Sequence, residues 1–137
     1  MAELDFNTAV VKAANAYLNG TAPPPDAVTV TASTATIANG ASLSDAVTVA
    51  AGATVWGVII PSAWTAAQIS FDVSHDSGVT YTSLRDPAGN EHVNAVTVST
   101  FIPFPTVVGV TNIKIRSGIS GTVVAQGAQR LLTVLVG

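Results

Sequence analysis

The sequence predicts an all-β fold: an antiparallel, jelly-roll-like β-sandwich of about eight strands that follows a short N-terminal helix and a proline-rich spacer. Three observations predict this class. After Pro25, apolar Val and Ile alternate with Thr and Ser, the period of a strand with one buried face. Turn residues separate these stretches, and no helical period lies between them. Charged residues make up only 9% of the chain, and Asp45 is the single one between Ala27 and Phe71.

The composition excludes several function classes. A chain of 137 residues has the size of one domain with one sizeable core. Its five basic residues are scattered and its net charge is −3, which argues against a nucleic-acid partner, because such proteins cluster Lys and Arg against phosphates. A cysteine-free sequence has no disulfide framework, thiolate zinc site or cysteine nucleophile. The low charge content indicates that much of the surface meets protein.

The first twenty residues predict an amphipathic helix. Polar side chains recur at the spacing of one helix face, at Thr8, Lys12, Asn15 and Asn19. The opposite face is apolar and carries Phe6, Val10, Ala13, Ala14, Tyr17 and Leu18. Asp5 or Asn7 can cap the start, and Gly20 the end. The apolar face packs either on the sheet of its own chain or on a neighbouring subunit. We take as candidate partner-binding residues Phe6, Val10, Ala14, Tyr17 and Leu18.

Pro23, Pro24 and Pro25 predict an extended spacer, because each ring fixes φ and disfavours helix in the preceding residue. We therefore divide the chain into an N-terminal arm, residues 1–25, and a β-sandwich domain, residues 26–137. The first residues are acidic where a secretory signal is basic, so we expect no export by that route. Residues 46–71 carry no charge, but their glycines, proline and strand period argue against a membrane span.

The candidate strands follow from the period of two and lie at residues 28–31, 47–49, 55–60, 69–74, 79–84, 95–101, 112–116 and 130–136. Turns are predicted at Asn39-Gly40, Asp76-Ser77-Gly78, residues 86–89 and Ser117-Gly118. Residues 55–60 are apolar on both faces except at Gly57, which predicts a central strand covered on both sides. A β-barrel and an immunoglobulin-like sandwich fit the same pattern, because strand order is not contained in the period.

Carboxylates and imidazoles gather in the middle of the chain, at Asp72, His75, Asp76, Asp86, Glu91 and His92. Their spacing matches neither a His-Glu-x-x-His metal motif nor a complete calcium loop. We interpret them as turn formers and solvated strand residues, with calcium binding at the turns and catalysis as alternatives. Lys114 and Arg116 share one strand face, which is typical of a solvated surface. We therefore predict no catalytic, metal or cofactor site and no enzymatic activity.

The two tryptophans receive different interpretations. Trp56 lies in the most apolar strand, which favours core packing. Trp64 follows Pro61 in a segment of small and polar residues, so it is the better candidate for contact with a ligand or a subunit.

Several segments together resemble small structural proteins of tailed bacteriophages. They are residues 35–44 (ATIANGASLS), 60–67 (IPSAWTAA), 69–81 (ISFDVSHDSGVTY), 113–118 (IKIRSG) and 126–133 (QGAQRLLT). The resemblance covers residues 35–136 and leaves the N-terminal helix unmatched. It implies a virion component made in the host cytoplasm, and it assigns no functional residue.

The expected role is a capsid decoration, or cement, protein that binds the head surface through non-covalent contacts and stabilises it. Its partners would be the major capsid protein or other virion proteins, with no nucleic acid and no membrane. We expect a homo-oligomer, and closed symmetric contacts make a trimer one of its natural forms. The alternative is a head fibre, tail or baseplate component that binds host-surface glycans through Trp64 and nearby loops.

Overall fold

A computed structural model describes residues 30–137, and the fold it gives this part of the chain is all-β. Ten strands form two antiparallel sheets, and residues 30–137 contain no helix, so the predicted all-β class is confirmed. The predicted N-terminal helix and spacer lie outside the described residues. The same holds for the candidate partner residues Phe6, Val10, Ala14, Tyr17 and Leu18.

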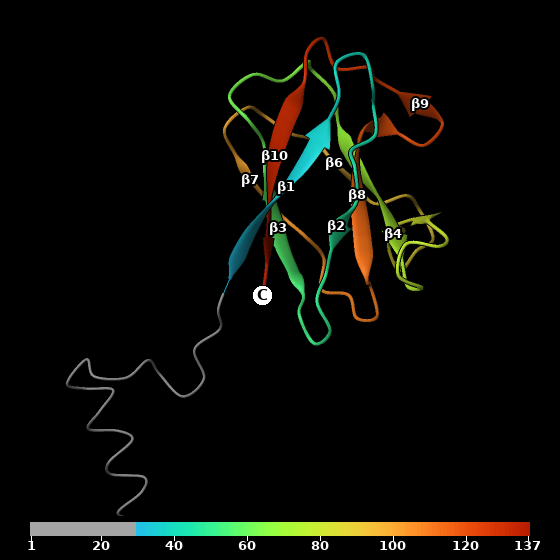
Figure 1. Cartoon of the computed structure of the whole chain (residues 1–137). Coiled ribbons are helices and arrows are strands. Elements are labelled where there is room, and N and C mark those ends of the chain that lie inside the picture. Colours follow the sequence, from blue (N-terminus) through green and yellow to red (C-terminus); the bar gives the residue numbers. More distant parts are fainter. Residues whose placement is uncertain (1–29) are drawn as a thin grey trace, which may run out of the picture.

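Sheet A has four strands, in the spatial order β1 (Thr31–Ile37), β10 (Arg130–Val136), β3 (Val55–Ile59) and β7 (Phe101–Pro103). The main path of sheet B runs β2 (Val47–Thr48), β8 (Asn112–Ile119), β4 (Ile69–Ser74) and β5 (Thr82–Ser83). Two short strands extend it, because β6 (Val93–Asn94) pairs with β4 and β9 (Thr122–Val123) pairs with β8. Figure 1 shows β1, β10 and β3 side by side, with β2, β8 and β4 beside them.

The chain passes from one sheet to the other repeatedly along its length. Strands β1, β3, β7 and β10 belong to sheet A, whereas β2, β4, β5 and β8 belong to sheet B. As a consequence, the first described strand pairs with the last one, and Thr31 lies opposite Val136. The fold therefore closes only when both ends of the described segment are present.

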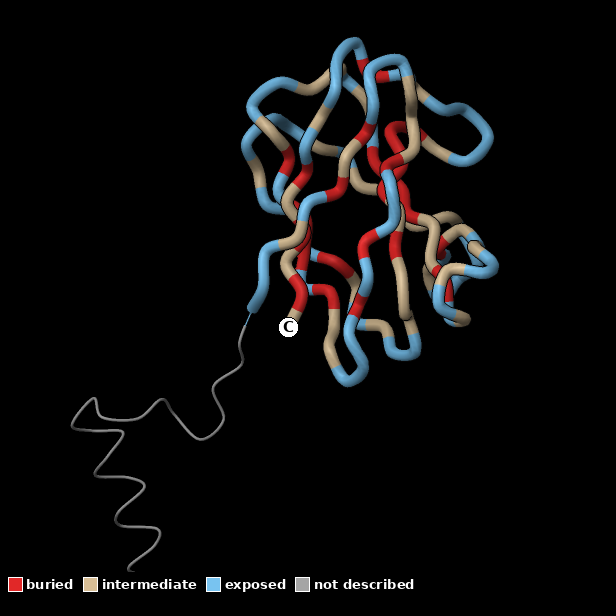
Figure 2. Tube along the Cα trace, in the orientation of Figure 1, coloured by how far each residue is buried: buried red, intermediate tan, exposed pale blue. Residues whose placement is uncertain are grey.

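The core lies between the two sheets and is built from alternate residues of their strands (Figure 2). Sheet A contributes Ala35, Ile37, Val58, Leu132 and Val134, and sheet B contributes Ile69, Phe71, Ile113 and Ile115, all fully buried. The period of two thus places β-branched and aromatic side chains on one face of each sheet, as the sequence predicts.

Five predicted strands are confirmed within a few residues, namely β2, β3, β4, β8 and β10. Three predictions are wrong in extent. Among the described residues, the strand predicted at 28–31 coincides with β1 only at Thr31, residues 79–84 form only the short β5, and residues 95–101 contain strand only at Phe101. The predicted turn at Ser117-Gly118 is also wrong, since both residues lie inside β8. Gly118 has a φ of 95°, and an added Cβ would lie 2.6 Å from the carbonyl oxygen of Thr122. The missing side chain at Gly118 allows β9 to approach β8 closely, and the chain does not reverse direction at this residue.

The prediction that residues 55–60 are covered on both sides is wrong for the single chain. Strand β3 is interior in sheet A, yet Trp56 is 46% exposed and Ile59 is 37% exposed. The register explains Trp56: Gly57 pairs with Leu135 and Val55 with Val136, so Trp56 is an extra residue with no opposite partner. Such a bulge re-aims a side chain, and here it turns an apolar residue that we expected in the core toward the surface.

Candidate functional site

The outer face of sheet A is the most unusual surface of the described chain. Its centre is a row that crosses all four strands, in which Thr34 pairs with Thr133, Thr133 with Ile59, and Ile59 with Phe101. The neighbouring positions on this side of the sheet are Ala32, Thr36, Pro103, Leu131 and Leu135, with Trp56 exposed beside them. We call these residues the apolar face. Leu131 is 56% exposed and Phe101 is 49% exposed, so large apolar groups here meet water in the single chain.

The apolar face carries no ionisable group among its residues. Arg130 is the one charged residue in the four strands of sheet A. Its side chain does not join this face, because its Nε donates to Oε1 of Gln126 at 3.1 Å and its Nη2 to Oγ1 of Thr65 at 3.3 Å. One carboxylate lies at its β1 edge, where Oδ1 of the exposed Asp45 accepts from the N–H of Thr36 at 2.8 Å. Covering the rest of the face would remove hydrocarbon and hydroxyl groups from water without desolvating a charge.

Phe101 and Gly57 shape the middle of this face. A Cβ on Gly57 would lie 2.3 Å from Cζ of Phe101 and 2.7 Å from the carbonyl oxygen of Ile102. The edge of the phenyl ring thus occupies the space beside Gly57 that a side chain would otherwise fill. The two residues keep the face smooth where a side chain would otherwise stand between β10 and β7.

The outer face of sheet B is polar in contrast, and its centre is an ionic network that the sequence pattern missed. Arg116 is only 8% exposed, and its Nη2 lies 2.5 Å from Oδ1 of Asp72. Its Nη1 lies 3.6 Å from Oε1 of Glu91 and donates to Oγ of Ser70 at 3.3 Å. Glu91 also accepts hydrogen bonds from the backbone N–H and the hydroxyl of Ser120. We expected solvated charges here, and the structure instead forms a largely buried set of mutually satisfied groups.

The next strand position on sheet B is also paired. Lys114 lies on the same side of β8 as Arg116, and its Nζ is 4.5 Å from the centroid of the Tyr81 ring. The ammonium group is therefore held by a cation–π contact. The prediction that Lys114 and Arg116 share a face is confirmed, whereas a solvated position is wrong for Arg116.

Asp76 and Asp86 are turn formers, as the sequence indicates. Oδ1 of Asp76 accepts hydrogen bonds from Oγ of Ser74 at 2.7 Å and from the N–H of Thr80 at 2.9 Å, and Oδ2 accepts from Oγ1 of Thr80. The bonds from Thr80 and then Ser74 hold the pKa of Asp76 far below the usual range of a carboxyl group. Oδ1 of Asp86 accepts from the N–H of Asn90 at 2.9 Å, which closes the turn at residues 86–89.

The remaining members of the central cluster do not converge on one point. His75 is exposed after the end of β4, whereas His92 packs beside Phe71 with ring centroids 6.2 Å apart. Nε2 of His92 is buried and has no hydrogen-bond partner within residues 30–137. The described residues contain no group of three or more His, Asp or Glu side chains arranged to hold a metal ion.

Trp56 lies at the surface, where the sequence favoured core packing, and Trp64 is half-buried. Trp64 is half-buried against the core, and its Nε1 donates to the carbonyl oxygen of Ala67 at 3.2 Å. Nε1 of Trp56 lies 3.4 Å from the carbonyl oxygen of Gly137, at the rim of the apolar face. The exposed aromatic groups beside sheet A are therefore Trp56 and Phe101, which the sequence pattern had assigned to buried or ordinary strand positions.

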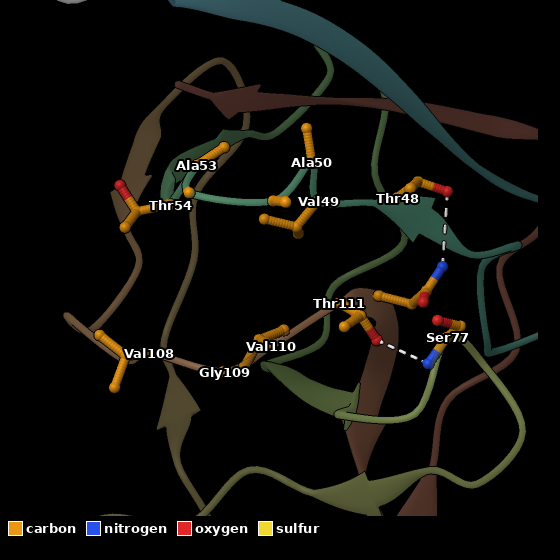
Figure 3. A pocket seen from close by; sticks show the side chains of 13 residues that line it. Thr48, Val49, Ala50, Ala53, Thr54, Ser77, Val108, Gly109, Val110 and Thr111 are labelled. Carbon is orange, nitrogen blue, oxygen red and sulfur yellow. Dashed lines mark hydrogen bonds between the residues drawn. The ribbon is translucent and has the colours of Figure 1, made fainter.

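A shallow hollow of about 560 Å³ lies at the end of the molecule where β2 leaves sheet B (Figure 3). The loop at residues 49–54 and the loop at residues 108–111 form its walls, and the lining carries no charged residue. Val108, on one wall, is 89% exposed. The N–H of Ser77 donates to Oγ1 of Thr111 at 3.0 Å across its floor. Small aliphatic groups and hydroxyls line the hollow, so a ligand there would be held by shape and hydrogen bonds and not by a charged side chain.

Comparison with known proteins identifies no relative: no family model, no curated protein and no solved structure matches the chain. Residues 30–137 also contain no helix of the length and hydropathy needed to cross a membrane.

Proposed function

We propose that this chain is a structural protein of a phage virion, and most specifically a capsid decoration protein that binds the head surface and stabilises it. The observation that carries the proposal is the apolar face of sheet A, which exposes Ile59, Phe101 and Leu131 and has no charged side chain among its own residues. Contiguous exposed apolar surface on a soluble domain marks a protein interface.

The energetics favour a permanent assembly over a transient one. Burial of apolar area contributes about 25 cal/mol per Å², less the cost of ordering both partners. A surface without charges avoids the desolvation cost that charged interfaces carry. An apolar face of this kind suits a protein that is bound once, in many copies, to a finished shell.

The strand order supports a jelly-roll arrangement within the two-sheet fold. Strands β6 and β9 lie off the main paths, which leaves eight strands. Numbered one to eight along the chain, they form one sheet in the order 1-8-3-6 and another in the order 2-7-4-5. This is the pairing of a jelly roll of two Greek keys, an architecture found in viral capsid and lectin domains. The fold agrees with the resemblance to phage structural proteins and by itself assigns no role.

The proposed partners are the major capsid protein or other virion proteins, together with further copies of this chain. We propose a homo-oligomer, for which a closed trimer is one natural form. The N-terminal arm, residues 1–25, then helps to attach the β-sandwich domain to the head.

Quantitative mass spectrometry of purified particles, with heads and tails separated, tests the proposal. Many copies per head support the decoration role. A handful of copies, or enrichment in the tail fraction, contradicts it and favours a fibre or host-contact part. Complete absence from particles overturns the virion assignment.

The second candidate is a fibre, tail or baseplate component that binds glycans. The observation that favours it is the exposed ring of Trp56, because flat aromatic faces stack on sugar rings. Loss of glycan-array binding in Trp56→Ala, with binding retained in Trp64→Ala, supports this candidate. Equal binding by both variants and the unaltered chain argues against it.

A further inference from the structure

Strand β1 forms one outer edge of sheet A, and it lacks the features that keep sheet edges apart. Its sequence, TASTATI, contains no charged residue, proline or glycine. Natural edge strands are usually short, charged or interrupted by proline, because a long open edge is a template for pairing with another chain. The other outer strands of the two main paths follow this rule, since β2 and β5 have two residues each and β7 has three, the last of them Pro103.

The hydrogen bonds of Thr36 show which backbone groups of β1 face outward. Its N–H donates to Oδ1 of Asp45 at 2.8 Å, and its C=O accepts from the N–H of Asp45 at 3.0 Å, so both groups point away from β10. Strand β1 pairs with β10 without a register shift. Because outward and inward groups alternate along an antiparallel strand, the N–H and C=O of Ala32 and Thr34 also point outward. Within residues 30–137 these groups have no hydrogen-bond partner.

The inner side of the same edge has room for further side chains. A hollow of about 350 Å³ lies there, and Thr31, Ser33, Thr48 and Val136 are among the residues that line it. Thr31 and Ser33 point toward it because they alternate along β1 with the buried Ala35. A strand added to this edge would direct its own alternate side chains toward the hollow. The edge therefore offers both main-chain partners and space for side chains.

We propose that β1 of one copy pairs with β1 of a second copy, antiparallel and across a twofold axis. A register that sets Ser33 opposite Ser33 of the second copy also sets Ala32 opposite Thr34, so every free outward group of β1 is bonded. Asp45 limits the register, because a shift of two residues toward the end of β1 would need the groups of Thr36 that Asp45 already bonds. The side chains at the contact are those of Thr, Ala and Ser, which are small enough for two strands to meet.

This contact uses the same surface on both copies, so it closes with two copies and does not extend into a fibre. Outer positions of one β1 lie opposite outer positions of the other, which puts the two apolar faces on the same side of one continuous sheet. The inference rests on the proposed homo-oligomer and names its contact. It predicts an assembly with an even number of copies, of which the dimer is the simplest.

Cysteine substitutions in the full chain test the register. The sequence contains no cysteine, so an introduced thiol can form a disulfide only with its copy in another chain. At Ser33 the two strands form a non-hydrogen-bonded pair, in which opposite Cα atoms lie about 4.5 Å apart, within the range of a disulfide. We therefore expect Ser33→Cys to give a disulfide-linked dimer after mild oxidation with diamide.

The matched control is Thr34→Cys, at the next residue of the same strand and more exposed than Ser33. In the proposed register the two copies of Thr34 are diagonal neighbours about 7–8 Å apart, too far for a disulfide without backbone movement. The control should give a yield lower by about fivefold or more. Equal yields from the two variants would overturn the register, and no disulfide in Ser33→Cys would overturn the pairing.

Light scattering of the full chain gives a second readout. Thr34→Pro removes an outward N–H that makes no bond to β10, and edge strands tolerate proline at such positions, so the domain should still fold. Thr34→Val keeps this N–H and is the control. We expect the unaltered chain and Thr34→Val to have twice the mass of Thr34→Pro. A monomeric unaltered chain, or an unchanged mass in Thr34→Pro, would contradict the proposal. Circular dichroism checks the fold of each variant, and the disulfide test decides if Thr34→Pro is unfolded.

The outcomes separate this contact from the proposed function. An oligomeric chain whose Ser33→Cys variant forms no disulfide would keep the homo-oligomer and exclude β1 as its contact. Counting copies in purified particles is a separate measurement, so a monomer in solution with many copies per head would overturn the pairing and leave the virion role standing. A dimer linked through Ser33→Cys that is absent from particles would do the reverse.

Discussion

The guanidinium of Arg116 lies 2.5 Å from the carboxylate of Asp72, across the β8–β4 ladder of a sheet whose opposite side forms the core. The two residues are diagonal neighbours, since Arg116 pairs with Ser70 and Asp72 with Lys114. Glu91 reaches the same guanidinium from another segment, beside β6. The largely buried guanidinium of Arg116, in β8, therefore links its own strand to β4 and to the segment that precedes β6.

Arg116→Met should destabilise the domain by about 3 kcal/mol or more, because it leaves two carboxylates partly buried without their cation. Chemical denaturation measures the loss as a fall in the midpoint. The control is the double variant Asp72→Leu/Arg116→Met, which removes the pair together and should recover part of the stability. A single variant as stable as the unaltered chain would contradict a structural role for this network.

Gln126 should be equally sensitive, because its buried amide bonds two other segments, at Thr65 and at Ser117. Oε1 accepts from the N–H of Thr65 at 2.8 Å, and Nε2 donates to Oγ of Ser117 at 2.7 Å and to the carbonyl oxygen of Thr65 at 3.1 Å. Gln126→Leu keeps a similar volume but leaves these groups without partners, at about 1–3 kcal/mol for each buried one. Thermal unfolding should show a clear fall in Tm. Gln129→Leu, at an exposed position nearby, is the control and should change little.

The lowered pKa of Asp76 predicts that acid reduces the stability of the folded domain. Its folded pKa lies below its unfolded pKa, so the ionised carboxylate favours the folded state. This contribution is complete above the unfolded pKa of about 4 and is lost as the pH falls through it toward the folded value. Asp76→Asn should therefore unfold less steeply with acid between about pH 4 and pH 2. Denaturation midpoints across this range measure the slope, and an unchanged slope would contradict the assignment.

Gly57→Val should disturb the apolar face without removing a core side chain. The new Cβ would overlap the ring of Phe101 and the carbonyl oxygen of Ile102, so β7 must move away from β3. A cost of about 1–3 kcal/mol is typical of such overpacking. Gly89→Val is a poorer control because of its positive φ, whereas Gly121→Val has open space and should cost less. Equal stability of the two variants would contradict the close approach.

Deletion of residues 1–25 should leave a folded domain that no longer attaches to purified heads, because the proposed arm is lost. Co-sedimentation with particles measures attachment, and circular dichroism checks the fold. Leu18→Glu, on the apolar side of the predicted helix, should weaken attachment, whereas Lys12→Ala should not. Full attachment of the truncated chain would rule out the arm.

The sequence predicts much of the fold because its main signal is local. The period of two identifies β4 and β10 with their correct ends, and the alternating apolar positions of these strands, Phe71 and Leu132 among them, are fully buried. It fails for Trp56, because exposure there depends on a bulge set by the register with β10, and register is a relation between distant residues. It fails for Arg116 for the same reason, since Asp72 and Glu91 come from other segments. The one signal in the sequence for the apolar face is the scarcity of charged residues in the strands that form sheet A.

The pairing of β1 with β10 has a consequence for the time at which the protein can fold. Strand β10 lies between β1 and β3 in sheet A, yet it is synthesised after every other strand of residues 30–137. Until it leaves the ribosome, β1 and β3 have no neighbour between them, and their apolar residues stay uncovered. Contacts between residues so far apart along the chain also form slowly. Sheet A can therefore form only after β10 has been synthesised, and a chain that lacks residues 131–137 should aggregate.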